Sequence, residues 1–122
     1  MVNKSILLVD DDNRNIFAMA AVLKARGFKV ASATAMNEAF RILDEPGSIG
    51  MVLMDMMMPG MDGYQAINFL KGEEKYKAIP VVAVTAQAMP GDREKCLRAG
   101  ADDYIAKPVD VDILLSVIKR WM

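Results

Sequence analysis

Histidine is absent from this chain of 122 residues, and cysteine occurs once, as Cys96. Without histidine the chain has no histidine-based catalytic triad, no histidine metal site and no phosphocarrier histidine of its own. A single cysteine cannot form an internal disulfide, which fits a reducing compartment and predicts a cytoplasmic protein. Because Cys96 stands among charged residues of a short predicted helix, we interpret it as a bystander without a chemical role.

An excess of either charge is also missing. Lysine and arginine number 15, aspartate and glutamate number 16, and the formal net charge is −1. Binding of nucleic acid or of an anionic membrane surface needs a basic face, so neither is expected. The longest apolar run, residues 16–23, is far shorter than the ~20 residues that span a bilayer. The N-terminus also lacks a signal-peptide pattern, because the apolar stretch after Lys4 soon ends in acidic residues.

The composition that remains is that of one folded domain. Apolar residues make up 53% and charged residues 25%, which excludes a disordered chain. Domains commonly have roughly 100–200 residues, so we expect one domain over residues 1–122. We find no linker, repeat or low-complexity segment, and the predicted elements leave no residues for an output domain.

Short β-rich runs alternate with segments of helical period. The runs are residues 5–10, 28–33, 51–55, 80–85 and 103–106, and the helical segments are 13–26, 37–44, 64–75, 91–99 and 111–121. Residues 6–9 and 81–84 are apolar without interruption, which is typical of strands buried on both faces of a parallel sheet. The sequence therefore predicts an α/β fold, a doubly wound parallel sheet of five strands with five helices on its two faces.

Reactive side chains stand where these strands end. Asp10 and Asp11 follow the first run, Asp55 ends the third, Thr85 ends the fourth, and Lys107 follows the fifth. The carboxyl ends of parallel strands share one edge of a sheet, and ligands of open α/β folds bind there. We therefore expect these five residues to converge, although they are far apart in the sequence.

The chemistry of this set favours a divalent cation. Carboxylates ~4 Å apart repel by about 4 kcal/mol per pair at an effective dielectric of ~20, and one lysine cannot offset three of them. Mg²⁺ can, because it prefers oxygen ligands and keeps waters and phosphate oxygens in its shell. A carboxylate beside Mg²⁺ can act as a nucleophile toward phosphorus, while Thr85 and Lys107 can bind phosphoryl oxygens. The sequence thus predicts a metal-assisted phosphoryl acceptor.

Neighbouring polar and sulfur-containing residues have simpler interpretations. Asp12 and Asp62 precede helical segments and are expected to be caps or turn residues. Methionines 56–58 are expected to fill the loop and core, because thioethers prefer soft metals to Mg²⁺. The backbone carbonyl of Met57 can still be a ligand.

Four segments resemble the receiver domains of two-component response regulators. They are ILLVDDD, VLMDMMMPGMDG, VVAVTA and DYIAKP, and they occur in the family's order and spacing over almost the whole chain. The resemblance implies that Asp55 is the phosphoacceptor. It also implies that Asp10 and Asp11 form the acidic pair, with Asp11 a direct Mg²⁺ ligand, and that Met57 gives its carbonyl to the metal.

The resemblance assigns further roles to the second half of the chain. Thr85 and Lys107 match the hydroxyl and the lysine that engage the phosphoryl group, and Tyr104 matches the aromatic switch residue. A cis peptide between Lys107 and Pro108 and the strand order 2-1-3-4-5 are also implied.

The function implied is that of a phosphorelay signalling module. It takes a phosphoryl group from a histidine of a partner, either a histidine kinase or a histidine phosphotransfer protein. Apart from its own phosphorylation and slow dephosphorylation it is no enzyme. It is either a free-standing regulator or a receiver from a hybrid histidine kinase.

We expect Thr85 and Tyr104, with the loop 86–89 and its small Ala86 and Ala88, to change a face made by the fourth helix, fifth strand and fifth helix. That face is expected to bind partners or to dimerise.

Three other functions fit the sequence less well. An aspartate-nucleophile phosphatase carries a second aspartate two residues after the nucleophile, where this chain has Met57, and there is no cap insertion. A flavodoxin-like FMN carrier has a Ser/Thr/Gly phosphate loop after its first strand, whereas residues 10–12 are acidic and repel phosphate. A pseudo-receiver scaffold would not need the complete acidic set.

Overall fold

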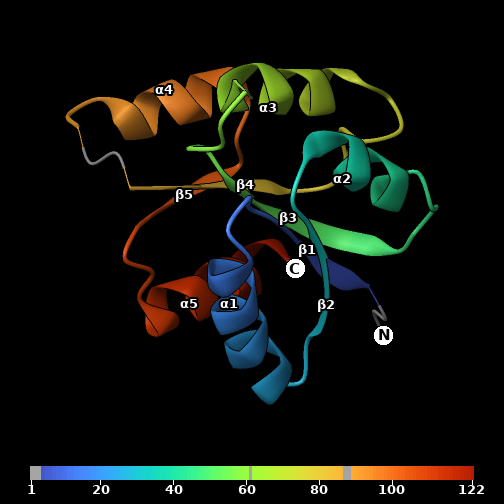
Figure 1. Ribbon diagram of the computed structural model, residues 1–122. Coiled ribbons are helices and arrows are strands. Elements are labelled where there is room, and N and C mark those ends of the chain that lie inside the picture. Colours follow the sequence, from blue (N-terminus) through green and yellow to red (C-terminus); the bar gives the residue numbers. More distant parts are fainter. Residues whose placement is uncertain (1–3, 61, 87–88) are drawn as a thin grey trace.

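The computed structural model describes residues 4–60, 62–86 and 89–122. Strands and helices alternate along the whole chain, as the sequence predicts (Figure 1). The elements are β1 (Ser5–Val9), α1 (Asn13–Ala25), β2 (Lys29–Ala33), α2 (Met36–Leu43), β3 (Ile49–Asp55), α3 (Gly63–Gly72), β4 (Val81–Thr85), α4 (Asp92–Ala99), β5 (Asp103–Ala106) and α5 (Val111–Trp121).

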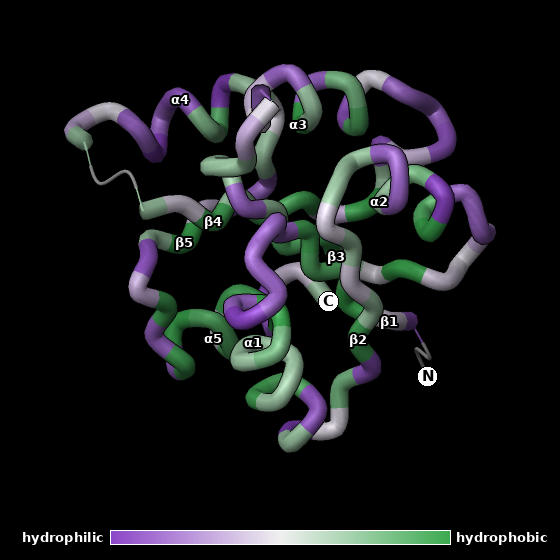
Figure 2. Tube along the Cα trace, in the orientation of Figure 1, coloured by the Kyte–Doolittle hydropathy of each residue, from purple (hydrophilic) through white to green (hydrophobic). Residues whose placement is uncertain are grey.

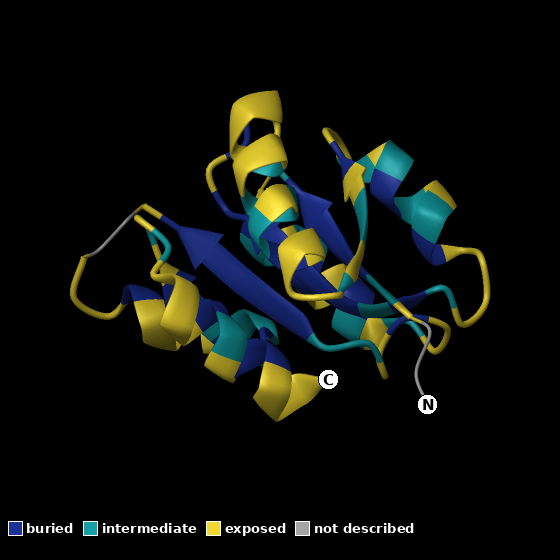
Figure 3. Cartoon of the chain, turned by 90° about the horizontal axis from the view of Figure 1, so that it is seen from below, coloured by how far each residue is buried: buried dark blue, intermediate teal, exposed yellow. Residues whose placement is uncertain are grey.

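The five strands form one parallel sheet in the order β2-β1-β3-β4-β5. This confirms both the predicted fold class and the strand order that the family resemblance implies. The order makes β1, β3 and β4 the inner strands. The inner strands are buried except at Ser5 and Gly50, and Figure 3 shows buried strands as dark blue arrows, as the uninterrupted apolar residues 6–9 and 81–84 indicate.

Helices cover both faces of the sheet, with α2, α3 and α4 on one side and α1 and α5 on the other (Figure 1). Successive residues of a strand point to opposite faces, and β1 divides its side chains accordingly. Leu7 and Val9 belong to the core under α2, α3 and α4, whereas Ile6 and Leu8 belong to the core under α1 and α5. Figure 2 shows the apolar colour concentrated along the strands between these two layers. No helix within the described ranges is long and apolar enough to cross a membrane.

Two element boundaries differ from the sequence prediction by two residues or more, and a glycine lies at each. β3 begins at Ile49, two residues before the predicted run. Gly50 is a poor strand former and separates Ile49 from that run, but Ile49 is buried and pairs with Ser5. α3 ends at Gly72 rather than at residue 75, since glycine is a poor helix former.

The predicted caps are confirmed. A carboxylate oxygen of Asp12 accepts a hydrogen bond from the backbone N–H of Arg14, and Asp62 accepts from the N–H groups of Tyr64 and Gln65. Each bond satisfies an N–H that has no partner within its own helix. The capped α3 and α1 therefore begin directly after the two loops that carry acidic residues at the carboxyl edge of the sheet.

Candidate functional site

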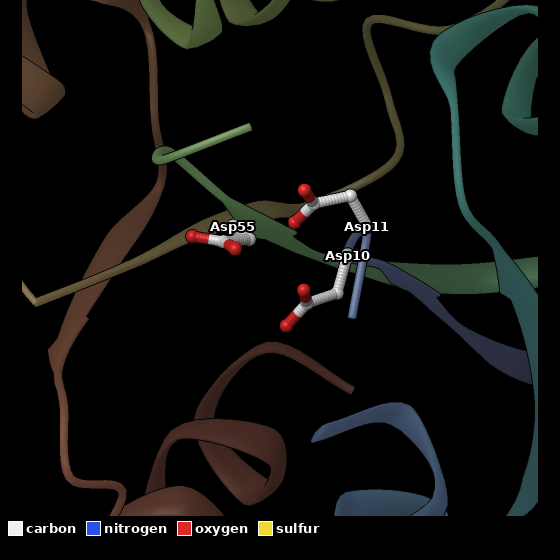
Figure 4. A group of neighbouring side chains, drawn as sticks. All are labelled: Asp10, Asp11 and Asp55. Carbon is white, nitrogen blue, oxygen red and sulfur yellow. The ribbon is translucent and has the colours of Figure 1, made fainter. Parts of the chain in front are cut away.

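Three carboxylates meet at the carboxyl edge of the sheet. Asp10 and Asp11 follow β1, and Asp55 is the last residue of the adjacent β3. One carboxylate oxygen from each lies within 4.8 Å of the other two. Figure 4 shows the three side chains converging from the two strand ends. The predicted convergence of the acidic residues is therefore what the structure shows.

Backbone hydrogen bonds orient two of these carboxylates. Oδ1 of Asp10 accepts from the N–H of Asp12 at 2.9 Å, and Oδ1 of Asp55 accepts from the N–H of Met57 at 2.9 Å. These are local turns in which a side chain caps the backbone two residues further on. As a result one oxygen of each carboxylate is fixed by the loop, and the other, Oδ2, faces the centre of the site.

Lys107 supplies the positive charge of the site. Its Nζ lies 3.4 Å from Oδ2 of Asp55 and 3.7 Å from Oδ2 of Asp10. The peptide bond from Lys107 to Pro108 is cis, as the family resemblance implies. The backbone N–H of Lys107 donates to the carbonyl of Thr85 at 2.8 Å, which fixes the end of β5 against the end of β4.

Negative charge remains in excess around Lys107. Burial raises the pKa of Asp10 above its ordinary value, and the nearby Asp55 carboxylate raises it further. The hydrogen bond from the Asp12 N–H and the charge of Lys107 act in the opposite direction but do not cancel the increase. Three acidic groups and one ammonium group thus leave a site that a cation would stabilise.

The donor set fits a hard divalent cation such as Mg²⁺. All three side-chain ligands are oxygens, and Mg²⁺–oxygen distances of about 2.1 Å allow two ligands to lie up to about 4.2 Å apart. The separations of at most 4.8 Å therefore need to close by only about half an ångström. Met57 is 48% exposed whereas Met56 and Met58 are buried, so the loop turns Met57 outward and fills the core with its neighbours.

Thr85 and Tyr104 lie on the neighbouring strands β4 and β5, and Tyr104 pairs with Ala83, two residues before Thr85. Thr85 is the buried last residue of β4, and its strand partner on β5 is Ala106. Tyr104 is half-buried, and its hydroxyl donates to Oδ2 of Asp92 at 3.1 Å. The predicted switch loop includes residues 87 and 88, which lie outside the described residues.

Two buried acids were not anticipated. Asp92, in the first turn of α4, accepts from both Tyr64 and Tyr104, and Asp103, the first residue of β5, accepts from Trp121. An acid in a first helical turn normally interacts with the helix dipole, so its position alone does not indicate that Asp92 is buried. Their partners come from distant parts of the chain.

Residues 6–119 match the family model of the response regulator receiver domain. The chain belongs to this family. Relatives of two kinds support the assignment. The polar-differentiation response regulator DivK of Brucella ovis is 31% identical, over 99% of this chain and 98% of DivK. A probable histidine kinase 6 of Oryza sativa subsp. japonica is 32% identical over 98% of this chain, which spans 14% of that kinase.

Solved receiver domains share the fold. The receiver domain of the sensor histidine kinase PA1611 from Pseudomonas aeruginosa PAO1 has a TM-score of 0.84 and 36% identity, over 97% of this chain and 96% of that one. That structure holds a magnesium ion in its active-site cleft. A response regulator receiver protein from Pseudomonas putida has a TM-score of 0.88 and 26% identity, over 98% of both chains. This receiver domain is thus a signalling module of a two-component phosphorelay.

Proposed function

We propose that Asp55 of this receiver domain is the phosphoryl acceptor and that Asp10, Asp11, Asp55 and the carbonyl of Met57 hold Mg²⁺. The observation that carries the proposal is the cluster of three carboxylates within 4.8 Å, together with the Nζ of Lys107 close to Oδ2 of Asp10 and Oδ2 of Asp55. The magnesium ion in the cleft of the Pseudomonas aeruginosa receiver supports the choice of metal.

The reaction is a direct transfer. A carboxylate oxygen of Asp55 forms a bond to phosphorus, the phosphorus–nitrogen bond of a phosphohistidine breaks, and the electron pair of that bond stays on the imidazole. Lys107, 3.4 Å from Oδ2 of Asp55, is placed to bind a phosphoryl oxygen as charge accumulates there. The Thr85 hydroxyl at the neighbouring strand end donates to another. Bound Mg²⁺ supplies charge neutralisation for the acceptor and the phosphoryl oxygens.

The donor histidine lies outside these 122 residues, because none of them is histidine. We propose a histidine kinase or a histidine phosphotransfer protein of the cytoplasm as the partner that carries it. The surface beside the acceptor suits a protein contact. A cleft of about 310 Å³ borders Asp55 and Lys107 and is lined by Ile16 and Met19 of α1, and Phe17 of the same helix is 77% exposed. The balanced charge gives no support to nucleic acid as a direct partner.

Phosphorylation with acetyl phosphate tests the acceptor. We expect the wild-type protein to gain one base-labile phosphoryl group in the presence of Mg²⁺ and none in the presence of EDTA, measured by intact-protein mass spectrometry. Asp55→Asn keeps the shape of the side chain but removes the nucleophile, so this variant should stay unmodified. A phosphoryl group on Asp55→Asn would place the acceptor at another residue.

The output we propose is a change of the face formed by α4, β5 and α5. A phosphoryl group adds roughly −1.5 to −2 charges beside Thr85 and Lys107, which gives the Thr85 hydroxyl a new acceptor and biases the position of Tyr104. Exposed apolar side chains in and beside these elements suit a partner or a second copy of the chain: Met89, in the loop before α4, is 71% exposed and Ile113 of α5 is 53% exposed.

Beryllofluoride with Mg²⁺ mimics the phosphoryl group and tests this output by NMR. We expect shifts at the described residues from Met89 to Ala106, beyond the metal site. Thr85→Ala should confine the shifts to Asp55 and its neighbours. Wild-type shifts that stop at Asp55 would favour phosphorelay without a conformational output.

A further inference from the structure

A buried carboxylate outside the acidic cluster bridges two tyrosines from different elements. Asp92 of α4 is 7% exposed. Its Oδ1 accepts from the hydroxyl of Tyr64 in α3 at 3.0 Å, and its Oδ2 accepts from the hydroxyl of Tyr104 in β5 at 3.1 Å. Figure 1 shows α3 and α4 side by side above the β5 end of the sheet. Each oxygen of this one group is thus bonded to a different element.

The surroundings make both bonds important to Asp92. No lysine or arginine nitrogen in the described ranges lies within 4.0 Å of its oxygens. Lys95 of the same helix lies over the ring of Tyr64, 4.4 Å from its centroid. The first-turn position gives Asp92 the partial positive charge of the helix N-terminus, which offsets part of the cost of burial. The two phenols supply its side-chain hydrogen bonds, and a buried carboxylate that loses a donor is strongly penalised.

We propose that Asp92 is the positioning residue of Tyr104, holding it in place and coupling its movement to Tyr64. The inference rests on the proposed switch role of Tyr104. When the ring of Tyr104 moves toward Thr85, its hydroxyl leaves Oδ2 of Asp92, and the carboxylate must reorient around its remaining bond to Tyr64. The bond opposes activation, and its loss is transmitted to α3 and to the first turn of α4.

The coupling follows from the chemistry of the shared acceptor. An asparagine at position 92 can accept from only one of the two tyrosines, and toward the other it can only donate, so a neutral, reversed bond replaces the charge-assisted one that the carboxylate makes. Phenylalanine at position 104 keeps the ring and removes the bond to Asp92. Either change should raise the fraction of molecules that are competent to bind the activating ligand. The apparent dissociation constant is inversely proportional to that fraction, so it should fall.

NMR titration with beryllofluoride and Mg²⁺ tests the proposal. The chain has three tyrosines, so ¹³C labelling of tyrosine rings gives signals that single Phe variants assign. In the wild type the signals of Tyr104 and Tyr64 should shift together. Asp92→Asn and Tyr104→Phe should each tighten the apparent affinity by about three- to tenfold. In Asp92→Asn the Tyr64 signal should no longer follow that of Tyr104, a result that a merely structural role would not produce.

Three further variants serve as controls. Tyr76→Phe is a matched control, because Tyr76 also donates to an aspartate, Asp44, but lies away from β5, and its affinity should equal that of the wild type. The double variant Asp92→Asn/Tyr104→Phe should match Tyr104→Phe alone, since Tyr104→Phe leaves no hydrogen bond between positions 92 and 104 for the second change to weaken. Tyr64→Phe gives an independent result if Asp92→Asn fails to fold, because it leaves Tyr104 as the remaining phenol donor to Asp92 and should weaken the apparent affinity for beryllofluoride.

The outcomes separate this inference from the function on which it rests. If the Tyr104 signal of the wild type does not move with beryllofluoride, the proposed switch is wrong and the role of Asp92 falls with it. If Tyr104 moves but Asp92→Asn and Tyr104→Phe bind beryllofluoride like the wild type, or more weakly, the switch stands and the positioning role of Asp92 is refuted.

Discussion

Replacing Asp11 with asparagine should stabilise the metal-free protein and remove its response to Mg²⁺. Asp11 is exposed, so the dielectric constant of water applies, and a pair of unit charges 4.8 Å apart then repels by about 0.9 kcal/mol. Its two carboxylate neighbours together account for about 1.7 kcal/mol. Asp10 is adjacent to Asp11 in the unfolded chain as well, which cancels part of that repulsion. We expect a gain in the free energy of unfolding between about 0.9 and about 1.7 kcal/mol.

Mg²⁺ should offset the greater stability of the variant. A ligand at ten times its dissociation constant stabilises the folded state by about 1.4 kcal/mol, and Asp11→Asn should lose this gain. The assay is urea unfolding in EDTA and in MgCl₂ at low ionic strength, where surface charges are least screened. Glu45→Gln is the matched control, because it also removes one exposed negative charge but lies in the α2–β3 loop, away from the site. The reasoning is refuted if Asp11→Asn is not stabilised in EDTA, or if MgCl₂ stabilises it as much as the wild type.

Three other substitutions have defined outcomes. Asp103→Asn should lower the free energy of unfolding by about 1–3 kcal/mol, measured by Trp121 fluorescence in urea. Burial alone would raise the pKa of Asp103, but the hydrogen bonds from Trp121 and its other donors lower the pKa, so the loss of stability is present at pH 7 and fades as the pH falls below about 4. Lys107→Ala should slow phosphorylation by acetyl phosphate about 100-fold and yet tighten Mg²⁺ binding in a titration, because a competing cation is gone. Gly63→Ala should destabilise the fold by about 1 kcal/mol in urea, since a Cβ there would lie 2.7 Å from Cε and 3.3 Å from Cα of Met56, and this clash should outweigh the helical advantage of alanine. A more stable variant would show that the Met56 side chain can move aside.

The sequence predicted the acidic cluster because strand ends are a topological property. Once residues 6–9 and 81–84 are taken as buried parallel strands, Asp10, Asp55 and Thr85 must share one edge, whatever the details of packing. The comparisons with known receivers and the geometry around Lys107 agree with that interpretation. Local patterns also predicted the caps at Asp12 and Asp62, since a cap involves neighbours in the sequence.

The buried acids could not be predicted in the same way. Asp92 is defined by Tyr64, 28 positions earlier, and by Tyr104, 12 positions later, and neither separation corresponds to a helical or strand period. Asp103 opens a strand that would ordinarily expose an acid, and Arg120 lies 17 positions further on. Such contacts depend on how helices pack across the sheet, which a pattern of apolar residues leaves undetermined.

The strand order places the residues of the proposed site on strands that differ in how easily they open locally. The acidic residues follow β1 or end β3, and both strands are paired on both sides. Tyr104 lies in the four-residue β5, which pairs with β4 alone, and Lys107 directly follows it. Native-state hydrogen exchange should therefore find the amides of β1 and β3 protected to near the global free energy of unfolding, with those of β5 exchanging through a smaller, sub-global opening. A molecule in that opened state would keep its metal ligands in register while losing the lysine and the tyrosine.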